Sequence, residues 1–463
     1  MNGSAPGPAA RAATDAPATE PGPDLEHLLR PLFHAAAPGA GAAVVVIRGA
    51  ERTVACRGHS DRSRERPVRA DTRFELGSVT KTFTGLLLAE MAARGEVGYD
   101  DPIDRYLPAD AAPGYPHERP ITLLHLATHT SGLPRSPVGL LPALAPRWFT
   151  RPYATFGPAH LLRALPRTPV RGTPGAQVRY SNLGCGLLGL LLANAAGQRY
   201  DDLLEARVCG PLGLMDTSCG PGREDAAGYR RGRRVPSFRL PALPGAAALR
   251  STADDMLRYL QAHLALDAVP LPERADAAVL RTALGEVRRP RAGRRRGGTR
   301  ISLGWNHRSV PSGGPAAARA VGKAAGKDGG PGVAPFDAWS DGWSDGSVDA
   351  SFDGSAGGPL GRPFGRPFGP LYGEAVGEQA GPAAEEAVGG ALDAPADGMA
   401  EVVYHVGTTR GFTTFVGFSP RAQVGLAVMA GTPPLRSRGF AQSAYDTLRA
   451  LVAERREAPA PEG

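Results

Sequence analysis

The stretch Phe74-Glu75-Leu76-Gly77-Ser78-Val79-Thr80-Lys81-Thr82-Phe83 marks the point where a short apolar run stops and a helical pattern begins. Apolar residues then recur three and four positions apart, at Val79, Phe83, Leu86, Leu87 and Met91. This spacing predicts a helix that ends near Gly95. Ser78 is therefore expected at the start of the helix with Lys81 on the same face, where residues three apart have Cβ atoms roughly 5–6 Å from each other.

A lysine amine beside a serine hydroxyl can take the hydroxyl proton and so turn a weak nucleophile into a reactive one. The alternative interpretation is that Ser78 caps the helix and Lys81 is a solvated residue of its first turn. Composition favours the first interpretation, because only three of the 53 Lys and Arg residues are lysines, and two of these lie in a low-complexity region. Arginine cannot release its proton, whereas lysine can. The pair is therefore our candidate for a reactive centre.

The chain has 463 residues, 42% of them hydrophobic and 21% charged, so it is long enough to bury a sizeable core. Its formal net charge of +8 comes in part from two arginine clusters, at 230–234 and 288–300. A nucleic-acid-binding protein needs a matching fold or aromatic platform beside such clusters, and the sequence has no such companion motif. Four scattered cysteines without a CxxC pair are too few for a disulfide scaffold. We therefore expect no nucleic-acid partner.

Residues 1–23 are rich in Ala, Pro and Gly and contain no apolar h-region of the kind that signal peptides carry. The longest apolar run, at 187–193, is too short to span a bilayer. We therefore expect a cytoplasmic protein with no membrane partner. Residues 1–24 and 456–463 are expected to be disordered tails.

Hydrophobic periodicity predicts strands at both ends of the chain and helices in the middle. The expected helices cover 25–37, 183–196, 200–212, 251–266 and 440–452. The expected strands cover 42–48, 52–57, 301–306, 402–407, 412–418 and 424–430. Short connections make the C-terminal strands antiparallel. The simplest α+β fold pairs the two terminal strand sets into one antiparallel sheet flanked by the terminal helices, with a helical subdomain at roughly 100–230 and a site where the two parts meet.

Two segments lack helix or strand periodicity. Residues 135–170 are Pro-rich and aromatic, and they are interpreted as a lid or pocket wall, or else as an ordinary surface loop. Residues 311–399 are dominated by Gly, Ala, Pro and Asp, which predicts a disordered low-complexity insertion. Its Asp-Gly repeats lack the pattern of a twelve-residue calcium loop, so plain disorder is favoured over calcium binding.

His125 and His129 are four residues apart, a spacing that can present a pair of metal ligands on one helix face. The helix lacks the Glu that a metalloprotease would carry, and no third ligand is evident. We therefore expect a structural loop here, with no metal and no cofactor.

Three short motifs, in this order along the chain, resemble those of the serine β-lactamase-like superfamily. They are Ser78-Val79-Thr80-Lys81, Tyr180-Ser181-Asn182 and His405-Val406-Gly407-Thr408. The Tyr-x-Asn form looks like the class C β-lactamase branch, which also holds D-alanyl-D-alanine carboxypeptidases, D-aminopeptidases and carboxylesterases. Residues 121–134 and 411–418 are similar to segments typical of that branch. The resemblance covers 25–310 and 400–455, and it implies a β-lactamase/transpeptidase-like serine hydrolase domain.

The first two motifs imply the catalytic groups. Ser78 is expected to be the acyl-accepting nucleophile, with Lys81 and Tyr180 as its base. Tyr180 would act as a phenolate or share its proton with Lys81, and a phenol with an ordinary pKa of about 10 needs a nearby cation for this role. Asn182 would hydrogen-bond both Lys81 and the substrate.

The third motif is expected to support the substrate through His405, Gly407 and Thr408. In the family's geometry the backbone N–H of Thr408 forms an oxyanion hole with that of Ser78. This chain carries His405 where the family's set has Lys, and a histidine with a pKa near 6.5 is mostly neutral at pH 7. The difference weakens the case for a substrate that bears a carboxylate.

We therefore expect a serine hydrolase, of esterase type, that acts on a small-molecule ester or amide through a Ser78 acyl-enzyme. An acyltransferase on the same fold stays open as an alternative, as does a D-aminopeptidase, carboxypeptidase or β-lactamase. A non-catalytic binding protein is disfavoured by the complete set of motifs. The patterns favour no particular acyl group, leaving group or oligomeric state.

Overall fold

The fold is that of a computed structural model. The residues that it describes are 19–36, 39–115, 118–138, 140, 156–222, 225–265, 275–293, 298–311, 399–432 and 437–454. Part of the predicted lid (139 and 141–155, with Trp148, Phe149 and Tyr153) and nearly all of the predicted insertion (312–398) lie outside them. The division into tails, insertion and subdomain stays a prediction.

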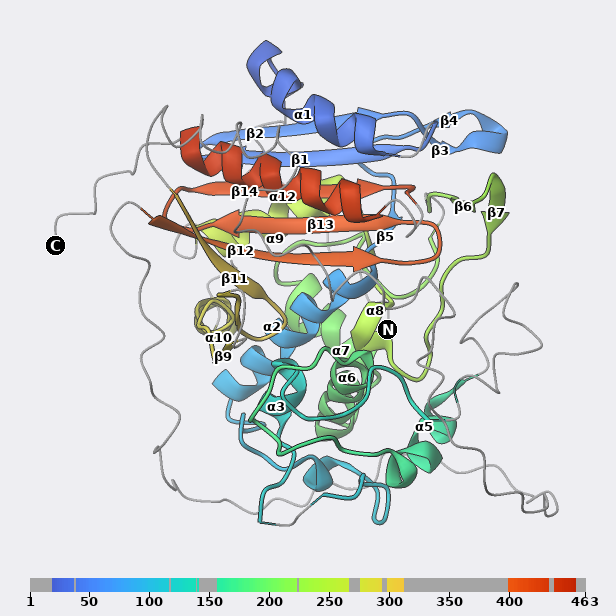
Figure 1. The fold of residues 1–463 in the computed structure, drawn as a ribbon, viewed down its shortest axis with the longest axis vertical. Coiled ribbons are helices and arrows are strands. Elements are labelled where there is room, and N and C mark those ends of the chain that lie inside the picture. Colours follow the sequence, from blue (N-terminus) through green and yellow to red (C-terminus); the bar gives the residue numbers. More distant parts are fainter. Residues whose placement is uncertain are drawn as a thin grey trace, which may run out of the picture.

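One eight-stranded sheet forms the upper half of Figure 1, with the strand order β2-β1-β14-β13-β12-β11-β10-β9. Its strands are β1 (Ala42–Arg48), β2 (Glu51–Arg57), β9 (Ala292–Gly293), β10 (Arg300–Ile301), β11 (Asn306–Pro311), β12 (Met399–Thr408), β13 (Thr413–Ser419) and β14 (Val424–Ala430). Three strand pairs are short: β3 (His59–Asp61) with β4 (Arg66–Pro67), β5 (Phe74–Glu75) with β8 (Arg250–Ser251), and β6 (Gly228–Arg230) with β7 (Arg233–Val235).

The two ends of the chain meet inside the large sheet. Strand β1 pairs antiparallel with β14 from Ala42↔Ala430 to Arg48↔Val424. Strand β1 is buried from Ala42 to Ile47. Its sequence is a continuous apolar run rich in Val and Ile, which is typical of strands that are covered on both faces. The expectation that terminal strand sets form one antiparallel sheet is therefore confirmed.

Helices cover both faces of the sheet. On one face, α1 (Pro23–Ala35) packs against α12 (Ser437–Glu454), which lies across β13 and β14 (Figure 1). On the other face, α9 (Ala253–Leu264) packs against β1 and β14. Alternate residues of the strands enter the two separate cores, because successive strand side chains point to opposite faces.

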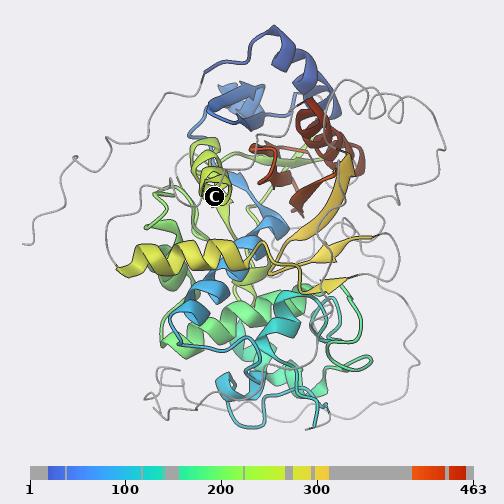
Figure 2. The ribbon, with the colours of Figure 1, turned by 90° about the vertical axis from the view of Figure 1, so that its left-hand side faces the viewer.

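The remaining helices gather below the sheet in Figures 1 and 2. They are α2 (Thr80–Ala93), α3 (Leu123–Ala127), α5 (Pro158–Ala164), α6 (Asn182–Ala196), α7 (Tyr200–Leu204), α8 (Pro244–Ala247) and α10 (Ala275–Glu286). Helix α2 is buried on every side from Thr80 to Met91, because α6, α8 and α10 all pack around it. None of the helices in the described part of the chain is long and apolar enough to cross a membrane.

Two element predictions were wrong in their bounds. The helix expected over 200–212 ends as an α-helix at Leu204 and continues as a π-helical turn, Glu205–Cys209. The single strand expected over 301–306 is a turn between β10 and β11. Gly304 makes that turn at φ +79°, where a Cβ would lie 2.4 Å from the carbonyl oxygen of Lys81.

Two glycines let the loop before α2 touch the end of β12. Gly77 has φ +53°, and a Cβ on it would lie 2.6 Å from the carbonyl oxygen of Thr408. A Cβ on Gly407 would lie 1.9 Å from the carbonyl oxygen of Leu76 and 3.0 Å from the backbone nitrogen of Ser78. The Ser78 turn and β12 therefore meet backbone to backbone, which no side chain larger than hydrogen allows.

Replacing Gly407 with alanine is expected to destabilise the protein, because the new methyl group must displace the Leu76 carbonyl or push β12 away. Overpacking of this kind typically lowers the free energy of unfolding by roughly 1–3 kcal/mol. Urea denaturation followed by circular dichroism measures the loss.

Gly431→Ala is the matched control. A Cβ on Gly431 meets its nearest atom at 3.7 Å, an ordinary van der Waals contact. We expect its unfolding midpoint to stay near that of the wild type. Equal midpoints for the Gly407 and Gly431 variants would contradict the backbone contact.

Candidate active site

Three side chains converge at the start of α2. Ser78 lies in the 3₁₀ turn Gly77–Val79, between β5 and α2, and is 6% exposed. Its Oγ accepts a hydrogen bond from Lys81 Nζ at 2.9 Å and another from the Tyr180 hydroxyl at 2.8 Å. The expected nucleophile and the two expected base residues therefore lie within hydrogen-bonding distance of one oxygen.

Lys81 is buried, and it has a second partner. Its Nζ also donates to the carbonyl oxygen of Ala246 in α8, at 2.7 Å. Burial lowers the pKa of Lys81 to about 7, and the charge of Arg135 acts in the same direction. Since an ordinary lysine has a pKa near 10.4, this amine is far better able to accept a proton at neutral pH.

Tyr180 precedes α6 and is partly buried. Burial raises the pKa of its phenol above the ordinary value, against the opposing effects of its bond to Ser78 and the charge of Arg135. The phenol is therefore protonated at neutral pH before substrate binds, and the phenolate form expected from the sequence is disfavoured. The better proton acceptor of the pair is Lys81.

Asn182 occupies the first turn of α6, after Ser181, whose Oγ accepts from the backbone N–H of Gly184 at 2.8 Å. Its side chain is fully buried, and within the described part of the chain neither amide atom has a hydrogen-bond partner. The expected bond between Asn182 and Lys81 is absent, because Lys81 uses Ala246 as its acceptor instead.

His405 comes from β12 and is buried. Its Nδ1 lies 2.9 Å from the carbonyl oxygen of Val406, to which it donates. Burial lowers the pKa of His405 to about 3, and the charge of Lys81 adds to this shift. His405 is therefore neutral at pH 7, as expected from its residue type.

The end of β12 adjoins the nucleophile through its backbone. A Cβ on Gly77 would lie 2.7 Å from the Thr408 nitrogen, and a Cβ on Gly407 would lie 3.0 Å from the Ser78 nitrogen. The peptide groups expected to form an oxyanion hole are therefore neighbours. Their role in stabilising an oxyanion stays a proposal.

Two further residues lie beside Tyr180: His129, which the sequence assigned to a structural loop, and Arg135, which the sequence did not single out. His129 has φ +60°, and its ring centroid lies 4.5 Å from that of Tyr180. Its Nδ1 accepts from the Ser181 N–H at 3.3 Å and so fixes the chain that carries Tyr180. The guanidinium carbon of Arg135 lies 5.3 Å from the Tyr180 ring centroid. His129 lies within the 121–134 segment and Arg135 follows it directly. The similarity of this segment to the family was the feature of the sequence that could have placed both residues at the site.

The His125–His129 pair has a structural explanation. His125 Nδ1 accepts from the backbone N–H of Thr122 at 3.2 Å, which completes the N-terminal cap of α3. Among the described residues there is no group of three or more His, Cys, Asp or Glu side chains that could hold a metal ion.

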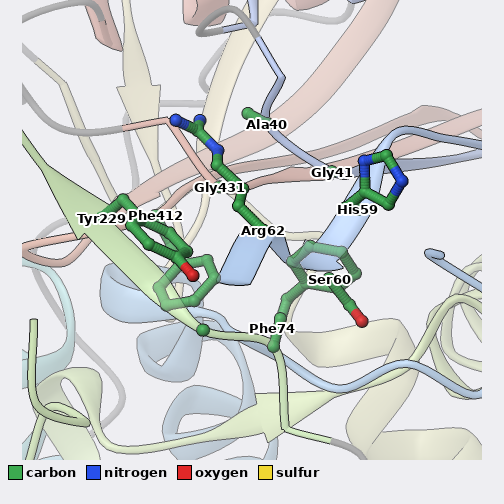
Figure 3. A pocket seen from close by; sticks show the side chains of 11 residues that line it. Ala40, Gly41, His59, Ser60, Arg62, Phe74, Tyr229, Phe412 and Gly431 are labelled. Carbon is green, nitrogen blue, oxygen red and sulfur yellow. The ribbon is translucent and has the colours of Figure 1, made fainter. Parts of the chain in front are cut away.

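A small hollow in the surface does not include the site (Figure 3). Phe74 and Phe412 line it together with Tyr229, and the guanidinium of Arg62 lies 5.1 Å from the Tyr229 ring centroid. Ser78 and its two hydrogen-bond partners are not among its lining residues. The candidate reactive centre is therefore defined by the hydrogen bonds at Ser78 Oγ and is separate from this hollow.

Comparison with known proteins identifies the relatives of this chain. A model of the Beta-lactamase family matches residues 30–336, which include Ser78, Lys81 and Tyr180 but not His405. The D-alanyl-D-alanine-carboxypeptidase/endopeptidase AmpH of Escherichia coli (strain K12) is 31% identical over 51% of this chain and 60% of its own length.

A Beta-lactamase of the same strain is 35% identical over 48% of this chain and 56% of its own length. Esterase EstB of Burkholderia gladioli is 32% identical over 51% of this chain and 69% of its own length. The matches to AmpH and to the Escherichia coli Beta-lactamase span about three fifths of those proteins. The family match covers most of the chain, and the sheet, the helices below it and the Ser78 turn agree with it: this protein belongs to the beta-lactamase family.

Proposed function

We propose that this protein is a serine hydrolase that cleaves small-molecule esters through an acyl-enzyme on Ser78. The observation that carries the proposal is the pair of hydrogen bonds at one hydroxyl oxygen, from Lys81 Nζ at 2.9 Å and from Tyr180 at 2.8 Å. A nucleophile within reach of a group that accepts its proton is the signature of covalent catalysis.

The proposed acylation begins with transfer of the Ser78 proton to the unprotonated amine of Lys81. The freed Oγ attacks the ester carbonyl carbon, and the oxyanion accepts hydrogen bonds from the N–H groups of Ser78 and Thr408. The tetrahedral intermediate then expels the alcohol, whose oxygen takes a proton from the Lys81–Tyr180 pair. Water repeats the sequence on the acyl-enzyme, releases the acid and restores Ser78.

Two observations favour an ester over the other substrates that relatives' names suggest. His405 is neutral, so the third motif lacks the fixed positive charge that a lysine would supply. The similarity to an esterase extends over a larger share of that relative than the similarity to the carboxypeptidase does. β-Lactam or peptide cleavage and acyl transfer rank below ester hydrolysis, and the absence of membrane and nucleic-acid partners stays a prediction.

A fluorophosphonate probe is expected to label the wild-type protein once, and Ser78→Ala is expected to abolish the label. Ser309→Ala, which changes an exposed serine of β11, should be labelled like the wild type. Intact-mass spectrometry gives the readout. Labelling that persists in Ser78→Ala would refute the assignment of the nucleophile.

Lys81→Arg is expected to lower kcat/KM on p-nitrophenyl esters by roughly 100- to 10,000-fold, the usual contribution of a positioned base. Arginine keeps the positive charge but cannot accept the Ser78 proton at any accessible pH. Near-wild-type turnover by this variant would show that charge alone suffices and would contradict the mechanism.

The pH dependence follows from the lowered pKa of Lys81, about 7. The amine accepts a proton only in its unprotonated form, so kcat/KM of the free enzyme should rise through pH 7 and level off above it. Initial rates with a neutral ester between pH 5.5 and 9, corrected for spontaneous hydrolysis, test this. A profile that is flat over that range, or that falls as the pH rises, would count against Lys81 as the base.

A further inference from the structure

The segment of the sequence that carries Tyr180 contains arginines but no acidic residues. From Arg119 to Tyr200 the sequence contains no Asp and no Glu. The same segment includes α3, α5 and α6, and it holds nine arginines: Arg119, Arg135, Arg147, Arg151, Arg163, Arg167, Arg171, Arg179 and Arg199. Arg199 forms ion pairs with Asp201 and Asp202, but between Arg119 and Arg179 the sequence has arginines without any acidic residue, and charges of one sign favour ligands of the opposite sign.

One arginine of this segment, Arg135, lies next to the reacting groups. Its carbonyl oxygen accepts from the N–H groups of Asn182 and Leu183, both at 3.1 Å, which fixes its backbone at the start of α6. Its guanidinium lies 5.3 Å from the Tyr180 ring centroid. Its charge lowers the pKa of both Lys81 and Tyr180, so its electric field reaches the Ser78 hydroxyl.

The guanidinium of Arg135 is not neutralised within the described part of the chain. Its Nε and Nη2 atoms are buried there without a hydrogen-bond partner, and no described carboxylate lies within ion-pair distance of it. The adjoining segment 139–155 contains no acidic residue either. Arg135 as a whole is only partly buried, but burying polar atoms of a cation without a partner is unfavourable for folding. Such a group beside a nucleophile is suited to an anion that arrives with the substrate.

A carboxylate fits this group best. The planar guanidinium presents paired N–H donors that match the two oxygens of a carboxylate. The two other basic groups of the site are poor competitors, since the pKa of Lys81 is about 7 and that of His405 is about 3. Arg135, in contrast, stays charged at every working pH.

We propose that Arg135 binds a carboxylate of the substrate beside Ser78, so that the enzyme prefers esters with an anionic acyl or leaving group. This inference rests on the proposed ester hydrolysis. It also revises the expectation drawn from His405: the positive charge that the third motif lacks is supplied by Arg135, which lies outside that motif.

The test compares carboxylate substrates with their methyl esters in two matched pairs. The first pair places the charge on the acyl side: mono-4-nitrophenyl terephthalate and its methyl ester. The second places it on the leaving group: 4-acetoxybenzoate and methyl 4-acetoxybenzoate. The wild type should prefer the carboxylate member of at least one pair by about tenfold or more in kcat/KM, and that pair identifies where the charge lies.

Arg135→Gln should bring the ratio of kcat/KM for the carboxylate member to kcat/KM for the methyl ester close to one, measured at pH 9 so that the Lys81 amine is unprotonated in both proteins. Arg135→Lys should keep part of the preference, because it retains charge but not the planar fork. Arg171→Gln is the control: it removes an exposed arginine of the same sequence segment and should leave the preference for the carboxylate member unchanged. Circular dichroism and fluorophosphonate labelling confirm that each variant is folded with an intact Ser78.

Several results would overturn the inference. One is a wild type with no preference in either pair, and another is a preference that survives Arg135→Gln. A third is a fall in kcat/KM of Arg135→Gln that is equally large for the charged and the neutral esters. This would mean that Arg135 acts through Tyr180 and not on the substrate. If the wild type is labelled at Ser78 but shows no charge preference, this inference alone fails. If it is neither labelled nor active on any ester, the proposed function fails and this inference with it.

Discussion

The backbone contact between the Ser78 turn and β12 is the constraint on which the site depends. Gly77 and Gly407 bring the two segments together more closely than any side chain would permit. One segment leads into a helix buried on every side, and the other is a central strand of the large sheet. The helical part and the sheet are therefore held together at the reactive centre itself, and movement between them would change the geometry around Ser78.

The second organising feature is the burial of positive charge without matching negative charge. Lys81 is enclosed by protein, and its nearest partners are a hydroxyl and a carbonyl oxygen. Burial lowers the pKa of this amine, so that a large fraction of it is unprotonated at neutral pH and can accept a proton. Arg135 cannot respond in this way, so it stays a cation. Lys81 and Arg135 therefore take different roles because a lysine loses its proton far more readily than an arginine. Lys81 acts as the proton acceptor, and Arg135 is the proposed anion-binding residue.

Local patterns were enough to predict the framework. The β-branched run of β1, the C-terminal strands and the Ser78–Lys81 spacing all follow from residue type and periodicity. The protonation of Tyr180 and the isolation of Asn182 were not predictable, because both depend on which distant atoms surround the side chain. The strand expected over 301–306 was wrong for a related reason. Its apolar residues alternate with Ser, Gly and Asn as in a strand, but Gly304 turns the chain against the Lys81 backbone, a contact that no local pattern records.

The pairing of β1 with β14 has a consequence for the order of events in biosynthesis. The nucleophile and its helix leave the ribosome well before β12, β13 and β14. Until those strands join β1, the large sheet lacks its centre and Ser78 lacks the peptide groups of β12. Native contacts of such long sequence separation form slowly. The site around Ser78 is therefore complete only after the C-terminal strands have been synthesised and have joined β1.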